Sequence, residues 1–210
     1  MAISALFPTL VCRRSLIDRN WRRFNQYLAD ECHALAASDD AGRTWSAQHY
    51  LGGYTSYGSL DRLHTVSSLF DKLRRKIEPH VKSFARDLHY DLRGRTLAMT
   101  DCWANVMPEG TFHSMHLHPT SFVSGVYYVA VPKGAGGLKF EDPRLSHHMA
   151  APPRRTDAPQ SFRPFANFPA KDGDLILFES WLRHEVMPAR FSGERISVSF
   201  NYAWTSGTGR

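Results

Sequence analysis

The sequence predicts a mainly β fold with helices: a jelly-roll barrel, or double-stranded β-helix, supported by N-terminal helices. The spacing of apolar residues changes from three or four positions to two at about Thr96, which indicates helices before this point and strands after it. The last strand-like segment has one polar and one apolar face, as expected of a sheet that packs on helices and lines a cavity. We expect one domain over residues 1–210, with mostly helical support in 1–95 and the jelly-roll core in 96–204.

Two apolar stripes predict helices in the first part of the chain. One runs over 17–35 and the other over 66–88, each with apolar residues three or four positions apart. Pro79 lies inside the second stripe, so we expect a kink or a break near Glu78. Both stripes are expected to face the core and not a cofactor.

Turn-rich stretches at 39–42 and 52–59 predict irregular structure, and the apolar start of the chain, 1–12, predicts a first strand. The predicted core strands are bounded by Gly and Pro and cover 96–106, 122–131, 137–140, 174–178 and 195–204.

The segment 142–169 fits neither pattern, because it contains six prolines and several arginines. A loop of this length in a compact domain is usually functional or disordered. Two interpretations stay open: a mobile insertion, or a basic lid over the barrel mouth that helps to choose the substrate.

Composition excludes some classes of function. The formal charge is +6, but the only Lys/Arg run longer than a pair is Arg74-Arg75-Lys76, so nucleic acid is disfavoured as a partner. A solvated basic face, or attraction for a small acidic cosubstrate, explains the charge equally well. The three cysteines are few and far apart, which indicates a reducing, cytoplasmic setting. No apolar run approaches the length of a membrane span, so no membrane partner is expected.

Three histidines are candidate metal ligands. His116 and His118 are two positions apart, so on a strand their imidazoles would face the same side, and His184 could return from a later strand. A single histidine is weak evidence in a chain with eleven, but this combination is stronger. Imidazoles suit Fe(II), Zn(II), Cu(II), Ni(II) and Co(II), so ligand type does not identify the metal. Asp142 is an alternative third ligand, although a turn role suits it better, and His113 is a weaker spare.

Arg195 and Ser197 are predicted to bind a carboxylate. They share one face of the last predicted strand, and together supply a guanidinium fork and a hydroxyl. A metal on one side and a carboxylate clamp on the other is the layout of an oxygenase that uses 2-oxoglutarate.

Several segments resemble a family of small bacterial 2-oxoglutarate/Fe(II)-dependent oxygenases, chiefly over 96–204. They include Trp103-Ala-Asn105-Val, His116-Leu-His118-Pro, Ser124-Gly-Val-Tyr-Tyr-Val129, Phe140-Glu-Asp-Pro-Arg144, Gly173-Asp-Leu-Ile-Leu-Phe178, Ser180-Trp-Leu-Arg-His184 and Arg195-Ile-Ser-Val-Ser-Phe-Asn201. The resemblance implies Fe(II) and 2-oxoglutarate as cofactors.

The resemblance also implies roles for single residues. His116 and His184 match the two histidine ligands of the wider superfamily, and His118 stands where that superfamily normally has Asp or Glu. Arg195 and Ser197 match the pair that holds the distal carboxylate of 2-oxoglutarate. Two further cosubstrate contacts are less specific. Asn105 resembles a cosubstrate-binding asparagine but could equally cap a turn, and Tyr128 lies opposite Tyr127 on its strand with the inward face unsettled.

The expected function is therefore a dioxygenase that uses O2, hydroxylates an unidentified small-molecule or peptide substrate, and releases succinate and CO2. One alternative is a three-histidine, cupin-type dioxygenase that does not use 2-oxoglutarate. Another is a non-catalytic barrel that binds a metal or a carboxylate. The sequence does not identify the substrate, and it does not decide whether the protein forms a homodimer.

Overall fold

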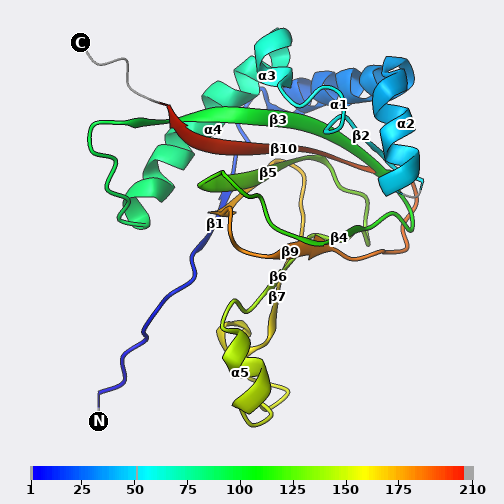
Figure 1. The fold of residues 1–210 in the computed structure, drawn as a ribbon. Coiled ribbons are helices and arrows are strands. Elements are labelled where there is room, and N and C mark those ends of the chain that lie inside the picture. Colours follow the sequence, from blue (N-terminus) through cyan, green and yellow to red (C-terminus); the bar gives the residue numbers. More distant parts are fainter. Residues whose placement is uncertain (1, 51, 206–210) are drawn as a thin grey trace.

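The computed structural model describes residues 2–50 and 52–205, with the side chain of His148 left out. The outermost positions of the expected domain, Met1 and 206–210, lie outside the described residues. Two antiparallel sheets face each other, and the helices of the first part of the chain cover the outer face of the larger sheet (Figure 1).

The larger sheet has the strand order β1-β8-β5-β10-β3-β2. Its strands are β1 (Val11–Ser15), β2 (Tyr54–Thr55), β3 (Thr96–Pro108), β5 (Val123–Ala130), β8 (Asp174–Glu179) and β10 (Glu194–Thr205). The smaller sheet has the order β4-β9-β6-β7, from β4 (His113–His116), β6 (Leu138–Glu141), β7 (Phe165–Phe168) and β9 (His184–Val186). This confirms the predicted jelly-roll type of fold, as two facing sheets and not as a closed barrel.

The five predicted core strands correspond to β3, β5, β6, β8 and β10, with ends shifted by at most two residues. The first strand lies later than expected, because 2–10 make no ladder and β1 begins at Val11. Short strands β2, β4, β7 and β9 have too few residues for a period of two to be visible in the sequence.

The helices are α1 (Trp21–Ser38), α2 (Asp40–His49), α3 (Leu63–Val66) and α4 (Ser68–Asp87). The prediction of irregular structure at 39–42 is wrong. Asp39 caps α2 instead, since its side chain accepts a hydrogen bond from the backbone N–H of Gly42. The same residues that favour turns also favour helix N-termini.

The break expected near Glu78 is absent, because α4 continues through Pro79. A proline inside a helix removes one backbone hydrogen bond. The buried face of α4, which includes Phe70, Ile77 and Val81, packs in the same core cluster as the outer face of the larger sheet. Burial of this stripe offsets the lost bond.

The prediction for the last strand is confirmed. Ile196, Val198, Phe200 and Tyr202 lie in the core between β10 and the helices. On the opposite face, Arg195, Ser197 and Ser199 line a cavity between the two sheets. Sheet alternation thus gives β10 a structural side and a side available for chemistry.

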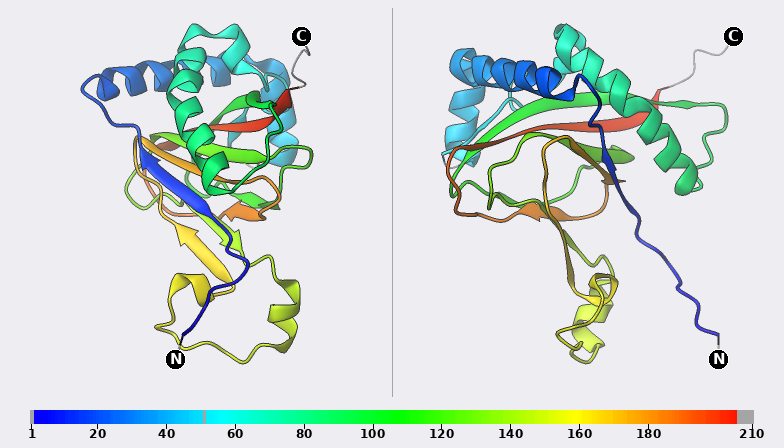
Figure 2. Two further views of the ribbon diagram at one scale, coloured as in Figure 1. Left: turned by 90° about the vertical axis from the view of Figure 1, so that its left-hand side faces the viewer. Right: turned by 180° about the vertical axis from the view of Figure 1, so that it is seen from behind.

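The segment 142–169 has structure of its own and is not a plain loop. It contains α5 (Leu145–Ala150), a short 3-10 helix η1 (Gln160–Phe162) and β7, and it projects from the end of the smaller sheet as a lobe (Figures 1 and 2). We call residues 142–169 the lobe. Among the described residues, no helix is both long and apolar enough to cross a membrane.

Candidate metal and cosubstrate site

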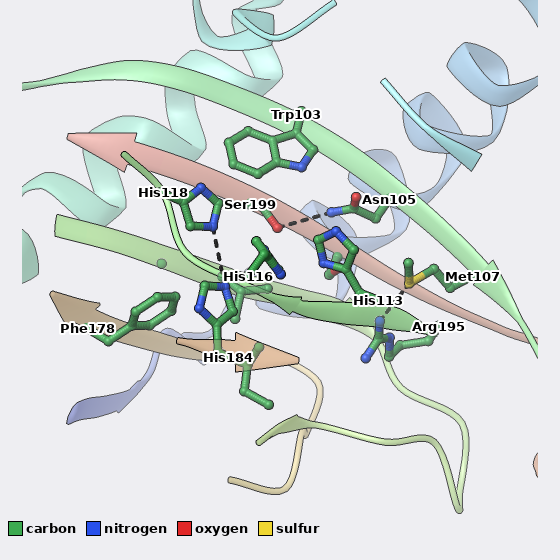
Figure 3. A pocket seen from close by; sticks show the side chains of 14 residues that line it. Trp103, Asn105, Met107, His113, His116, His118, Phe178, His184, Arg195 and Ser199 are labelled. Atoms are coloured by element: carbon green, nitrogen blue, oxygen red, sulfur yellow. Dashed lines mark hydrogen bonds between the residues drawn. The ribbon is translucent and has the colours of Figure 1, made fainter. Parts of the chain in front are cut away.

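Three histidine rings meet between the sheets (Figure 3). His116 ends β4 and is the cross-strand partner of His184, the first residue of β9. The available ligand atoms of His116, His118 and His184 all lie within 4.8 Å of one another. The Nε2 atoms of His118 and His184 are 3.3 Å apart. The structure therefore brings together all three predicted metal ligands.

His118 reaches the group in a different way from the one predicted. It lies beyond the end of β4, so strand alternation does not orient it. Instead, its backbone N–H donates to the carbonyl of Ser180, at 2.9 Å. The Ser180 hydroxyl is in turn buried against that of Ser124, at 2.7 Å. This backbone hydrogen bond between two connecting segments thus holds the ring of His118 in place.

Hydrogen bonds to backbone carbonyls set the tautomers of two of the rings. Nδ1 of His116 is 2.7 Å from the carbonyl oxygen of Ser114, and Nδ1 of His184 is 2.9 Å from that of Leu182. A carbonyl can only accept, so each Nδ1 carries the hydrogen. Each Nε2 then carries a lone pair that faces the other rings, as in histidines that bind metal ions, and Nε2 of His184 lies within hydrogen-bonding distance of Nε2 of His118.

The rings are neutral near pH 7. Burial lowers the pKa of His118 to about 4 and that of His184 to about 3, and the neighbouring imidazoles add to the effect. Burial also lowers the pKa of His116. Neutral imidazoles are the form that binds metal ions, so no proton has to be displaced at physiological pH.

The spacing of the nitrogens fits a metal ion. Two imidazole nitrogens about 2.1 Å from one cation lie about 3.0 to 3.4 Å from each other at octahedral or tetrahedral angles. The 3.3 Å between His118 and His184 falls in this range. Within the described residues the cluster contains no carboxylate. Asp142, the alternative ligand, instead pairs with Arg144 at 2.7 Å and accepts from the backbone N–H of Arg144, which is the turn role.

Arg195 is a buried cation without a buried anion. Its side chain comes from β10 and is 4% exposed. The guanidinium donates to the carbonyl of Gly136 at 2.8 Å and contacts the Met107 sulfur at 2.7 Å. No carboxylate of the described residues lies within ion-pairing distance of it. Because an uncompensated buried charge is costly, this position is suited to an anionic ligand.

The inward face of β5, left open by the sequence, is that of Tyr128. Tyr127 points to the helices, where its hydroxyl donates to Asn25 at 2.6 Å. Tyr128 packs between the sheets near the backbone N–H of Leu138, and its buried hydroxyl finds no acceptor among the described residues. It lies within electrostatic range of Arg195. An orphaned hydroxyl beside an unpaired guanidinium is a further sign of a missing acceptor.

Residues 101–201 match the family described as "Putative 2OG-Fe(II) oxygenase". The match covers just under half of the chain, and this part is similar to the core of 2OG-Fe(II) oxygenases. The recognition made from the sequence motifs is thereby confirmed at the level of the family. No curated protein matches the chain.

Solved structures similar to this chain include a prolyl-4-hydroxylase from Pseudomonas putida, with 18% identity over 94% of both chains and a TM-score of 0.55. The epimerase SnoN, in complex with Fe3+, alpha ketoglutarate and nogalamycin RO, has 14% identity over 96% of this chain and 88% of its own, with a TM-score of 0.61. HygX from Streptomyces hygroscopicus, with nickel, 2-oxoglutarate and hygromycin B bound, has 14% identity over 93% of this chain and 83% of its own, with a TM-score of 0.60. At these identities the similarity shows the fold.

The floor of the cavity is polar. Asn105 on β3 lies directly opposite Ser197 on β10, and its side-chain amide donates to the Ser199 hydroxyl at 3.1 Å. All three residues line the cavity with Arg195. Asn105 thus faces the predicted cosubstrate position, and its side chain does not cap a turn.

His113, which the sequence marked only as a spare, lines the same cavity. Its ring lies 4.0 Å from that of His116, centroid to centroid, and its Nε2 is hydrogen-bonded to the hydroxyl of Tyr50. Burial, with the other histidines and Arg195, lowers the pKa of His113 to about 2. No sequence signal links Tyr50 to His113, because they are 63 positions apart.

The cavity itself is small in this conformation, at about 40 Å³. A cavity of this size holds a few water molecules and not a five-carbon dicarboxylate. A carboxylate bound there would compete with Gly136 and Met107 for the guanidinium of Arg195.

Proposed function

We propose that this protein is a non-haem Fe(II)- and 2-oxoglutarate-dependent dioxygenase that hydroxylates an organic substrate and releases succinate and CO2. His116, His118 and His184 would hold the iron. Arg195 and Ser197 would hold the distal carboxylate of 2-oxoglutarate, with Asn105 and Tyr128 as further contacts. The family description and the metal-bound and 2-oxoglutarate-bound states of SnoN and HygX support this assignment.

The observation that carries the proposal is the pairing of a buried cation with neutral metal ligands in one cavity. Arg195 needs an anion, and a carboxylate would satisfy both its fork and the orphaned hydroxyl of Tyr128. The three imidazoles contribute no negative charge to the metal site, whereas 2-oxoglutarate contributes two. The ligand thus balances charge at both ends of the cavity.

Iron and 2-oxoglutarate, when bound, supply the oxidation chemistry by coupling O2 reduction to decarboxylation of the cosubstrate. The protein itself would bind the iron and the 2-oxoglutarate and orient them. Backbone carbonyls fix the tautomers of His116 and His184, the Ser180 carbonyl positions His118, and the apolar residues Val126, Leu138 and Phe178 keep bulk water from the cavity.

The test is an anaerobic titration with Fe(II) followed by 2-oxoglutarate, monitored by visible absorption. A band that needs both components is expected for the parent protein. Arg195→Ala should still bind iron but should require far more 2-oxoglutarate to develop the band. If Arg195→Ala titrates like the parent, the carboxylate clamp is wrong.

A second candidate follows from the missing carboxylate ligand: a three-histidine dioxygenase in which Arg195 holds the carboxylate of the substrate itself. Quantification of succinate separates the two. One succinate per O2 consumed supports the 2-oxoglutarate enzyme, and O2 consumption without succinate supports the second candidate. Tight binding of a metal other than iron, with no O2 consumption, would indicate a non-catalytic binding protein.

A further inference from the structure

The metal histidines belong to a closed circuit of ring contacts that extends to the surface. On one side, the His118 ring lies 5.7 Å from Trp103, and Trp103 lies 5.0 Å from Tyr57. On the other side, His116 lies 4.0 Å from His113, and His113 lies 4.7 Å from Tyr50. All these distances join ring centroids.

Trp45 closes this circuit. Its ring lies 6.0 Å from Tyr57 and 5.8 Å from Tyr50. Trp45 is on α2, and Tyr50 and Tyr57 flank β2, so one short part of the chain, 45–57, places three aromatic rings beside the candidate site. Figure 3 shows the Trp103 ring at the opposite side of the pocket from Phe178 and His184.

The circuit changes from buried to exposed along its length. Trp103 is buried and lines the cavity, Trp45 is half-buried, and Tyr57 is 47% exposed. A continuous series of packed aromatic rings therefore connects the exposed Tyr57 to the ring of His118, with His49 stacked on Trp45 at 4.1 Å between centroids. Exposed aromatic side chains that continue into a cavity are typical of ligand sites, where they supply contact area at low entropic cost.

The charges of the cavity limit what can bind there. Among the described residues that line it, Arg195 is the only one with a formal charge, and none is a carboxylate. A cationic group would lose its hydration without gaining a counter-charge. A second anion would compete with the cosubstrate for Arg195. The lining thus favours a neutral, apolar ligand.

We propose that Trp45, Tyr57 and Trp103 form the face on which the organic substrate of this oxygenase binds, and that this substrate presents a neutral, apolar ring. We call these three residues the aromatic face. The inference rests on the proposed function, because it assumes that His118 binds the metal and that Arg195 is taken by 2-oxoglutarate. The inference adds to the proposed function the chemical class of the substrate group that would lie near the metal.

The test uses the metal-free full-length protein and indole as the probe, followed by NMR of the tryptophan side-chain N–H groups. The chain has five tryptophans, so the signals of Trp45 and Trp103 can be compared with those of the rest. Saturable shifts confined to the aromatic face are expected, with a dissociation constant in about the millimolar range for so small a ligand. Tetramethylammonium should produce no such shifts.

Tyr57 is the residue to replace, because a substitution at an exposed side chain has little effect on folding. Tyr57→Ala should weaken indole binding at least about fivefold, whereas Tyr57→Phe should retain it. Tyr27→Ala is the matched control, because Tyr27 is also 47% exposed but lies on α1 beside Arg23. Its affinity for indole should equal that of the parent.

Indole shifts spread over all the tryptophans, or unchanged affinity in Tyr57→Ala, would overturn the aromatic face. Tighter binding of tetramethylammonium than of indole would overturn the neutral class of ligand. Succinate formation tests the proposed function separately. A protein that forms succinate but does not bind indole refutes only the face, and one that binds indole but forms no succinate refutes only the function.

Discussion

Two regions of this molecule carry arginines, and they differ in what surrounds the charge. In the lobe, Arg144 pairs with Asp142 and Arg155 pairs with Asp157, with the guanidiniums at least half exposed. In the cavity, Arg195 is buried and no carboxylate of the described residues faces it. By sequence alone the lobe is the more conspicuous basic region. Arg195 is the only buried arginine among the described residues, and it is the one that we propose as the binding group.

The difference shows that a buried arginine without a counter-charge is a better indicator of a binding site than a large number of exposed arginines. Exposed pairs of the kind seen in the lobe contribute little to stability or binding. A buried guanidinium that lacks a counter-charge persists at a cost, and a ligand can remove that cost. No described residue of the lobe lines the cavity beside Arg195, so its expected role as a lid has no contact to support it in this conformation.

The largest effect is expected at the proposed metal ligands. His184→Ala removes one of three nitrogens and should lower iron affinity at least about 100-fold, because replacement of even a residue that only orients a ligand costs 10- to 100-fold. Competition with a chromophoric chelator measures this affinity. His33→Ala, at an exposed histidine on α1, should bind iron like the parent. Equal affinities in the two variants would remove His184 from the site.

Arg195→Met tests the difference between the cavity and the lobe. It should weaken 2-oxoglutarate binding without lowering the free energy of unfolding. Loss of the buried ion pair should weaken 2-oxoglutarate binding about 100-fold. Without cosubstrate, replacing an unpaired buried charge by an apolar side chain of similar length should leave the free energy of unfolding unchanged or raise it by about 1 to 3 kcal/mol.

Calorimetric titration and urea unfolding measure the two effects of Arg195→Met. The matched lobe variant is Arg155→Met, which should leave both quantities like those of the parent, because surface substitutions of this kind have little effect. A marked destabilisation by Arg195→Met would show that the contacts with Gly136 and Met107 are structural.

The buried histidines should make the metal-free protein sensitive to mild acid. The pKa values of His118 and His184 are about 4 and about 3 in the folded state, below the usual value near 6.5. Between the folded-state and the usual pKa values, the unfolded chain binds more protons than the folded protein. The free energy of unfolding therefore falls as the pH drops below about 6.5. Each such histidine contributes about 1.4 kcal/mol per pH unit in this window.

Urea unfolding at pH 7.5, 6.5 and 5.5 measures that dependence. His118→Gln should make it shallower, because one of the contributing groups is gone. The carboxylates do not obscure the result, since a lowered pKa such as that of Asp142, about 2, places their effect at lower pH. An identical slope in His118→Gln and the parent would contradict the buried, neutral state of His118.

The smallest effect is expected at Tyr128. Tyr128→Phe removes a hydroxyl that has no hydrogen-bond acceptor among the described residues, so the unfolding free energy should not fall. Affinity for 2-oxoglutarate should decrease about tenfold, the worth of one hydrogen bond to a charged group. If stability falls while affinity is unchanged, the hydroxyl does not contact the cosubstrate.

Much of the fold is local in origin and could be predicted. The change of apolar period near Thr96 and the two faces of β10 depend only on residues adjacent in sequence, since alternation in a strand is a property of the backbone. The same alternation placed Arg195 and Ser197 on one side. Helix α2 could not be predicted, because its residues favour a turn as well as a helix and the capping hydrogen bond of Asp39 stabilises the helix. The unbroken α4 could not be predicted either, because packing of its buried face keeps it continuous through Pro79.

By itself, the sequence determined the types of side chain available for the site and the strand face that carries Arg195. Only the tertiary structure decided that His118 joins His116 and His184, since a backbone hydrogen bond to Ser180 holds it there and not strand alternation. It also decided that Tyr128 faces inward, that Tyr50 stacks on His113, and that Tyr57 lies between Trp103 and Trp45. The physical reason is distance along the chain: such contacts form only when the sheets and helices pack, and no local pattern encodes them.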